Sequence, residues 1–109
     1  MSLNELRDEC HSIAREKGWY DNGPRNFGEA LMLIVTEVAE AMEEHRERRD
    51  DLWFAEGSMK PEGVPIELAD ILIRIFDLAG SLKIDLDAAV RLKIEYNKTR
   101  PHRHGGKVA

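Results

Sequence analysis

The chain has 109 residues, of which 42% are hydrophobic and 34% charged, and its formal net charge is −5. This length and composition are typical of a single soluble helical domain rather than a disordered chain. Charged residues interrupt every apolar run, so no membrane span is expected, because a span needs roughly 20 apolar residues. Nucleic acid is not expected as a partner either, since binding to a phosphate backbone requires a broad positive surface.

The beginning of the chain, MSLNELRDEC, lacks the basic and apolar segments of a secretory signal. Its single cysteine, Cys10, cannot form an internal disulfide, so the sequence has no sign of an oxidising compartment. We therefore expect a cytoplasmic location.

Helical periodicity predicts an all-α domain of four helices over residues 1–100, followed by a polar, basic tail over residues 101–109. Ser2 and Glu5 have the spacing of a capping box, which predicts a first helix reaching about Gly18. Turn residues fill positions 18–26 and predict a loop there. Good helix formers then predict the longest helix, from Phe27 to about Asp50.

Residues 51–65 combine aromatic residues with two glycines and two prolines, which favours a loop over a strand. A third helix is expected over roughly Ile66 to Leu82, with Pro65 in its first turn. Asp85 is a good N-cap for a fourth helix, from Leu86 to about Thr99, and Pro101 stops it.

Two pairs of acids have the same i, i+3 spacing: Glu37 with Glu40, and Glu67 with Asp70. Such spacing places both carboxylates of a pair on one side of a helix, and two antiparallel helices would bring all four together. Clustered negative charges repel, and a cation removes that repulsion. Ligands that are all oxygen atoms favour Mg²⁺ or Mn²⁺, and Mg²⁺ commonly shares its site with substrate phosphates.

Solvated surface acids are the alternative reading for any one pair, because charged residues are usually exposed. The third helix argues against that reading, since it is apolar around most of its circumference and is expected to be buried, partly against a second subunit. Arg74 is predicted to form a salt bridge with Asp70 or Asp77. A di-iron site is disfavoured, because neither helix carries a Glu-x-x-His pair.

Three polar residues share one face of the fourth helix, namely Lys93, Asn97 and Arg100. Their cations and amide suit phosphate oxygens, although basic residues also favour helix C-termini for electrostatic reasons. Trp19, in the first loop, is a candidate for stacking on a nucleobase.

These segments resemble the MazG-like nucleoside triphosphate pyrophosphohydrolases over nearly the whole chain. Glu37-Val-Ala-Glu40 and Glu67-Leu-Ala-Asp70 are similar to the family's ExxE and ExxD motifs. The loop from Trp19 to Asn26 and the segment Tyr96-Asn97-Lys98-Thr99-Arg100-Pro101 are also similar to single-domain members. One position departs from the pattern: many members have Glu where this chain has Thr36, and Glu44 is the candidate substitute.

The resemblance implies a four-helix unit that packs with a second subunit into a homodimer or homotetramer. It implies Mg²⁺-dependent cleavage of a nucleoside triphosphate between its α and β phosphates, giving a nucleoside monophosphate and pyrophosphate. The four acids would bind the metal, with Glu37 or Glu40 acting as a catalytic base. Lys93, Asn97 and Arg100 would hold phosphates, and Trp19 and Asn26 would contact the base. Two alternatives remain open: hydrolysis of another nucleotide such as phosphoribosyl-ATP, and a helical dimerisation module without activity.

Overall fold

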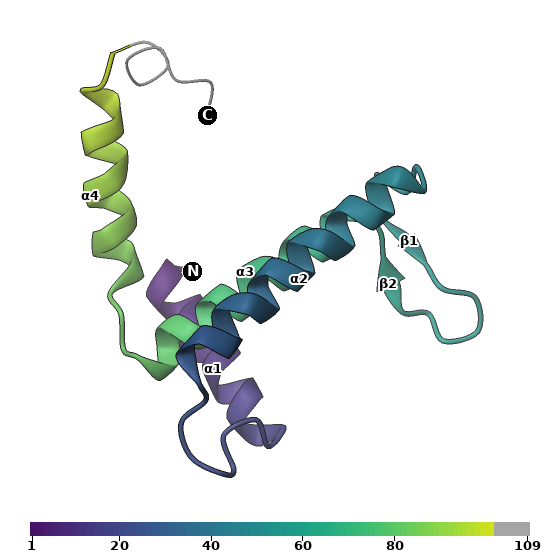
Figure 1. The fold of residues 1–109 in the computed structure, drawn as a ribbon, viewed down its shortest axis with the longest axis horizontal. Helices are drawn as coiled ribbons and strands as arrows, with labels where there is room; N and C mark the ends of the chain where they lie inside the picture. The colour runs from purple at the N-terminus through teal and green to yellow at the C-terminus, as the bar shows by residue number, and fades with distance from the viewer. Residues whose placement is uncertain (102–109) are drawn as a thin grey trace.

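The computed structural model describes residues 1–101 and is mostly helical. Helix α3 (Val64–Ser81) packs against α1 (Leu3–Glu16) and α2 (Phe27–Arg46), while α4 (Leu86–Lys98) projects away from them (Figure 1). Helix α2 runs towards a small hairpin and α3 returns from it, so these two helices are antiparallel (Figure 1). The predicted all-α class is confirmed in broad terms.

Local caps explain where the helices begin. The Ser2 side chain accepts a hydrogen bond from the backbone N–H of Glu5, whose carboxylate accepts one from Ser2 N–H, so the predicted capping box is present. Asn26 caps α2, and Asp85 caps α4 as predicted. Pro65 lies in the first turn of α3, which begins two residues before the predicted Ile66.

Helix α2 ends at Arg46, whereas the sequence favoured an end near Asp50. Arg48 has a positive φ of 61°, and the N–H of Arg49 bonds to the carbonyl of Glu44, so the chain leaves the helix through a left-handed turn. Composition did not reveal this end, because good helix formers continue past it.

A two-stranded antiparallel sheet joins α2 to α3, formed by β1 (Trp53–Phe54) and β2 (Pro61–Glu62). The prediction of a loop without strands was therefore wrong for these four residues. Pro61 is tolerated because a strand of a two-stranded sheet has an edge that needs no N–H. Gly57 and Met59 supply the positive φ angles of the connecting turn.

Helices α1 and α4 cap each other at their N-termini. Asp87 accepts hydrogen bonds from the backbone N–H groups of Leu3 and Asn4, and the Asn4 side chain in turn accepts one from Leu86 N–H. Arg7 adds a bond to the carbonyl of Ile84. These contacts hold only the first turn of α4, and every residue from Ala88 to Thr99 is exposed in the single chain.

The core of the single chain is small: among the described residues, its buried apolar side chains are those of Ala30, Phe76 and Ala79. None of the described helices is both long and apolar enough to cross a membrane. Of the predicted tail, residues 102–109, with His102 and His104, lie outside the described part of the chain.

Candidate metal centre

The two acid pairs meet between α2 and α3, as their spacing predicted. One carboxylate oxygen from each of Glu37, Glu67 and Asp70 lies within 4.8 Å of the other two. Glu37 is buried and the two α3 acids are half-buried. Glu40 is exposed at the edge of this group, one turn beyond Glu37, and interacts with both Glu37 and Glu67. We call these four residues the acid cluster.

Mutual repulsion and burial disturb the protonation of the acid cluster. Desolvation, followed by the charges of Glu40, Asp70 and Glu37, raises the pKa of Glu67 to about 7. Desolvation also raises the pKa of Asp70, and hydrogen bonding to Glu37 is the main cause that raises the pKa of Glu40. These carboxylates hold protons more tightly than ordinary surface acids do.

The donor set of the acid cluster fits a hard divalent cation. Oxygen Oε2 of Glu67 is buried without a hydrogen-bond partner, which is costly for a carboxylate. A cation among these oxygens would satisfy that atom and offset the repulsion that contributes to the three raised pKa values. Oxygen ligands from carboxylates are those that Mg²⁺ and Mn²⁺ prefer.

Arg74 pairs with a different acid from those predicted. Its Nε donates to Oε1 of Glu37 across the α2–α3 interface, at 2.7 Å. The prediction named Asp70 or Asp77, both on α3 with Arg74. The partner is instead on α2, because the guanidinium reaches across to the buried carboxylate of Glu37, whose charge requires compensation.

A cavity of about 230 Å³ between α1 and α3 is lined both by Asp70 of the acid cluster and by residues of the loop between α1 and α2. Asp70 and Arg74 line one part of it, and Trp19 and Arg25 line another. The guanidinium of Arg25 lies 5.2 Å from the centre of the Trp19 ring, in cation–π contact. Trp19 is 60% exposed, so its ring is accessible beside the cavity.

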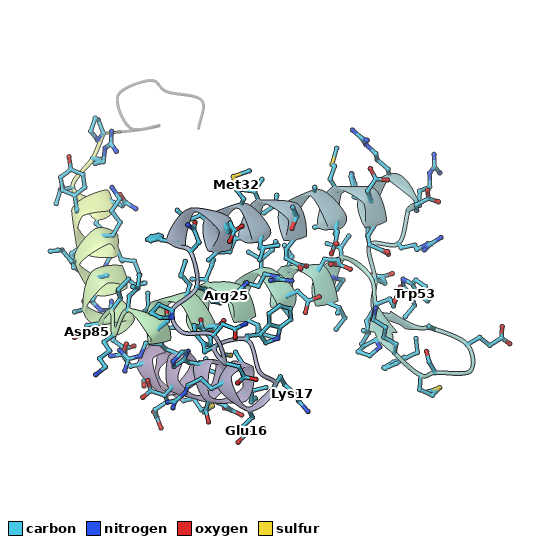
Figure 2. All side chains as sticks on the ribbon, turned by 60° about the horizontal axis from the view of Figure 1, so that its bottom comes forward. Glu16, Lys17, Arg25, Met32, Trp53 and Asp85 are labelled. Atoms are coloured by element: carbon cyan, nitrogen blue, oxygen red, sulfur yellow. The ribbon has the colours of Figure 1, made fainter. Side chains whose placement is uncertain are left out.

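Sequence reasoning missed the role of Asp77, the second buried acid of the described chain. Tyr20 OH donates to Asp77 Oδ1 at 3.0 Å, and His11 Nδ1 lies 2.9 Å from the same oxygen. Arg25 lies 3.6 Å from Oδ2. Figure 2 shows Arg25 over α3, in the loop that follows α1. Its place in the narrow polar stripe of an otherwise apolar helix was the available signal, but its partners are 52 to 66 residues away in sequence.

The predicted phosphate-binding residues lie far from the acid cluster within one chain. Lys93, Asn97 and Arg100 are on α4, which stands apart from the end of α3 that carries Glu67 and Asp70 (Figure 1). Lys93 and Arg100 both lie over the ring of Tyr96, at 4.9 and 5.8 Å from its centre. The single chain does not bring these cations to the acids.

Three further positions have local roles in this structure. Asn26, predicted to contact a base, uses its side chain to accept a hydrogen bond from Glu29 N–H at 3.0 Å. Thr36 is exposed and donates to the carbonyl of Leu33. Glu44, the candidate substitute ligand, accepts a hydrogen bond from Trp53 Nε1 at 3.3 Å and pairs with Arg49 at 3.8 Å.

The chain is similar to human dCTP pyrophosphatase 1. The two are 30% identical over 112 aligned positions, which cover 94% of this chain and 61% of the human protein. The chain thus spans about three fifths of that relative. No protein-family model matches the chain, and no solved structure matches it significantly.

The relative's name describes a nucleoside triphosphate pyrophosphatase, which agrees with the resemblance drawn from the acid motifs. Such an activity suits a cluster of carboxylates that can hold a divalent cation.

Proposed function

We propose that the chain belongs to the MazG-like family and hydrolyses a nucleoside triphosphate between its α and β phosphates, with Mg²⁺ as cofactor. Water is consumed, and the products are a nucleoside monophosphate and pyrophosphate. The observation that carries the proposal is the convergence of Glu37, Glu67 and Asp70 with the unpartnered Oε2 of Glu67. The similarity to a dCTP pyrophosphatase supports the reaction class.

Glu37, Glu67 and Asp70 would hold the cation, with Glu40 at the edge of the site as a fourth ligand. Bound Mg²⁺ or Mn²⁺ supplies charge neutralisation for the phosphates and lowers the pKa of a bound water. Glu40 is exposed and has a raised pKa, so it is the better placed of the two catalytic Glu residues to accept the proton of the attacking water. Glu37 is buried and paired with Arg74, so its main role is as a ligand.

Trp19 would stack on the base, because its exposed ring stands beside the cavity that also reaches Asp70. Asn26 caps α2 in the same loop, so its contribution to base contact would come through positioning Arg25 and Trp19 as well as through its own amide. Neither Trp19 nor Asn26 by itself determines which base the substrate carries.

A second copy of the chain would supply the β- and γ-phosphate contacts from Lys93, Asn97 and Arg100. In one chain α4 stands apart from the end of α3 that carries Glu67 and Asp70 (Figure 1), and α4 is exposed along most of its length. A homodimer or homotetramer is therefore part of the proposal. A cytoplasmic location and the lack of a nucleic-acid partner stay predictions.

Pyrophosphate release from a panel of ribo- and deoxyribonucleoside triphosphates, with Mg²⁺ or Mn²⁺, tests the proposal. Phosphoribosyl-ATP belongs in the panel, because its hydrolysis would favour the alternative nucleotide substrate. Glu40→Gln and Asp70→Asn are expected to lower turnover at least 100-fold while circular dichroism stays unchanged. Glu43→Gln, on an exposed position of α2, is the matched control and should keep full activity.

A helical dimerisation module without activity makes the opposite prediction. It would release no pyrophosphate from any member of the panel and would bind no Mn²⁺. Full activity in Glu40→Gln and Asp70→Asn would show that the acid cluster is not the site.

A further inference from the structure

Arg74 has donor groups that the fold does not use. Its Nε donates to Glu37, and no hydrogen bond engages its two terminal nitrogens within residues 1–101. The side chain is 34% exposed and lines the 230 Å³ cavity. An arginine kept only to neutralise Glu37 would have no need to present its remaining N–H groups to a cavity.

The order of side chains along α3 gives Arg74 a defined place. Asp70, Arg74 and Asp77 follow one another on one side of the helix, about 6 Å and then about 4.5 Å apart along its axis. Asp70 belongs to the acid cluster, and Asp77 holds Arg25, which lies against Trp19. Arg74 therefore lies between the cation-binding end of the cavity and its aromatic end.

A nucleotide has the same order of chemical groups: the base, then the sugar, then the phosphate attached to it and the remaining phosphates. With the base against Trp19 and the phosphate chain at the acid cluster, the sugar-linked phosphate would come next to Arg74. A guanidinium is suited to this position, because its fork of N–H groups matches phosphate oxygens.

We propose that Arg74 binds the α-phosphate of the nucleotide through its terminal nitrogens while Nε stays on Glu37. This inference rests on the proposed function, because it needs a nucleotide in the cavity. It adds a substrate contact that comes from the same chain as the acid cluster.

The alternative is that Arg74 only compensates the charge of Glu37. Under that alternative its removal would change cation binding and stability, and nucleotide affinity would change only in parallel with cation affinity. Binding of Mn²⁺ alone and binding of a nucleotide therefore separate the two roles.

Titration calorimetry with the α,β-methylene analogue of dCTP, in Mg²⁺, measures the contact without turnover. Arg74→Gln should weaken analogue binding about 10- to 100-fold, the usual effect of losing a charge-assisted hydrogen bond. Arg74→Lys should weaken it about 3- to 10-fold, because a single ammonium replaces the fork. In both variants, the affinity for Mn²⁺ without nucleotide should stay within about threefold of the wild-type value or rise. A rise is possible because Glu37 is no longer paired with Arg74.

Arg46→Gln is the matched control, because Arg46 is also ion-paired on an acid-bearing helix, at 3.4 Å from Glu43, but lies outside the cavity. It should leave analogue binding unchanged. If Arg74→Gln fails to fold, Arg74→Lys decides the question.

Equal analogue affinity in the wild type and the folded Arg74 variant would overturn the inference, and so would a parallel loss of Mn²⁺ binding. In either case, pyrophosphate release by the wild type would leave the proposed function standing. A wild type that neither hydrolyses the panel nor binds the analogue would overturn both.

Discussion

Nδ1 of His11 lies 2.9 Å from Oδ1 of Asp77, and this contact joins α1 to the C-terminal half of α3. Tyr20 and Arg25 reach the same carboxylate from the loop between α1 and α2. Asp77 is only 7% exposed, and a buried carboxylate is costly unless it is paired, so these three partners compensate it. The contact therefore anchors the loop that carries Trp19.

Asp77→Asn is expected to lower the free energy of unfolding by about 1 to 3 kcal/mol, because the buried partners lose the charge they were paired with. Urea unfolding measures the loss. Proteolysis at residues 18–26 should become faster, since the loop loses its anchor. Asp8→Asn is the control: Asp8 is also paired with an arginine, but its side chain is 67% exposed, so a change within about 0.5 kcal/mol is expected. Equal stability of the two variants would argue against the anchor.

Gly80 allows α1 to approach α3 closely. A Cβ at this position would lie 2.6 Å from Cβ of His11 and 3.1 Å from the carbonyl oxygen of Arg7. Gly80→Ala should gain up to about 1 kcal/mol in helix propensity but lose about 1 to 3 kcal/mol through overpacking, so a net destabilisation is expected. Thermal unfolding measures it.

Gly28→Ala is the matched control for this close approach. Gly28 is exposed in the first turn of α2, and a Cβ there would meet only Asn26 Oδ1, at 3.4 Å. This variant should be as stable as the wild type or slightly more so. If Gly80→Ala were equally harmless, α1 and α3 would not be packed as described.

Short-range signals predicted most of the helix positions. The caps Ser2 and Asp85 act within three residues of themselves, so spacing alone reveals them. The acid pairs could also be predicted from the sequence, because an i, i+3 spacing places both acids of a pair on the same side of a helix. The end of α2 and the hairpin were missed, since they depend on a left-handed turn at Arg48 and on pairing of Trp53 with Glu62.

Contacts between distant segments could not be read from spacing. Arg74 was assigned to an acid of its own helix, whereas its partner Glu37 lies 37 positions earlier. The environment of Asp77 depends on how α1 and the following loop pack on α3. Both cases concern an ionic group whose partner is decided by tertiary packing.

The raised pKa of Glu67 predicts how stability depends on pH in the absence of divalent cations. Its folded value of about 7 exceeds the ordinary value of 4.5, so the folded state binds the proton more tightly than the unfolded state does. Stability contributed by this group is fully present below about pH 4.5 and is lost as pH rises towards 7. Asp70 and Glu40 also have raised pKa values, so their contributions to stability decrease with rising pH in the same way.

Urea unfolding in EDTA from pH 5 to pH 8 should therefore show Glu67→Gln gaining stability relative to the wild type as pH rises. We expect the free energy of unfolding of Glu67→Gln to rise on the order of 1 to 2 kcal/mol relative to the wild type. This is less than the full change in pKa would give, because solvent reaches the site and screens its charges. Saturating Mg²⁺ should stabilise the wild type more than Glu67→Gln at pH 8. A pH-independent difference between the two proteins would contradict the raised pKa of Glu67 and the burial and repulsion that cause it.

Helix α2 carries an apolar stripe that faces away from the rest of the chain. Leu31, Val35, Val38 and Met42 recur at spacings of four, three and four, and they are between 46% and 53% exposed. Met32, beside the stripe, also points outward from α2 (Figure 2). With so few buried apolar side chains among residues 1–101, such a stripe is expected to pack against a second copy.

Sedimentation should therefore give a mass of two or four times the 12.5 kDa of one chain. Val35→Asp places a charge in the stripe and should shift the protein towards the monomer or unfold it, because a buried unpaired charge is costly. Thr36→Asp adds the same charge at an exposed position about 100° around the helix and should leave the mass unchanged. A wild type that sediments as a single chain of 12.5 kDa would leave Lys93, Asn97 and Arg100 without a route to the acid cluster and would contradict their proposed role.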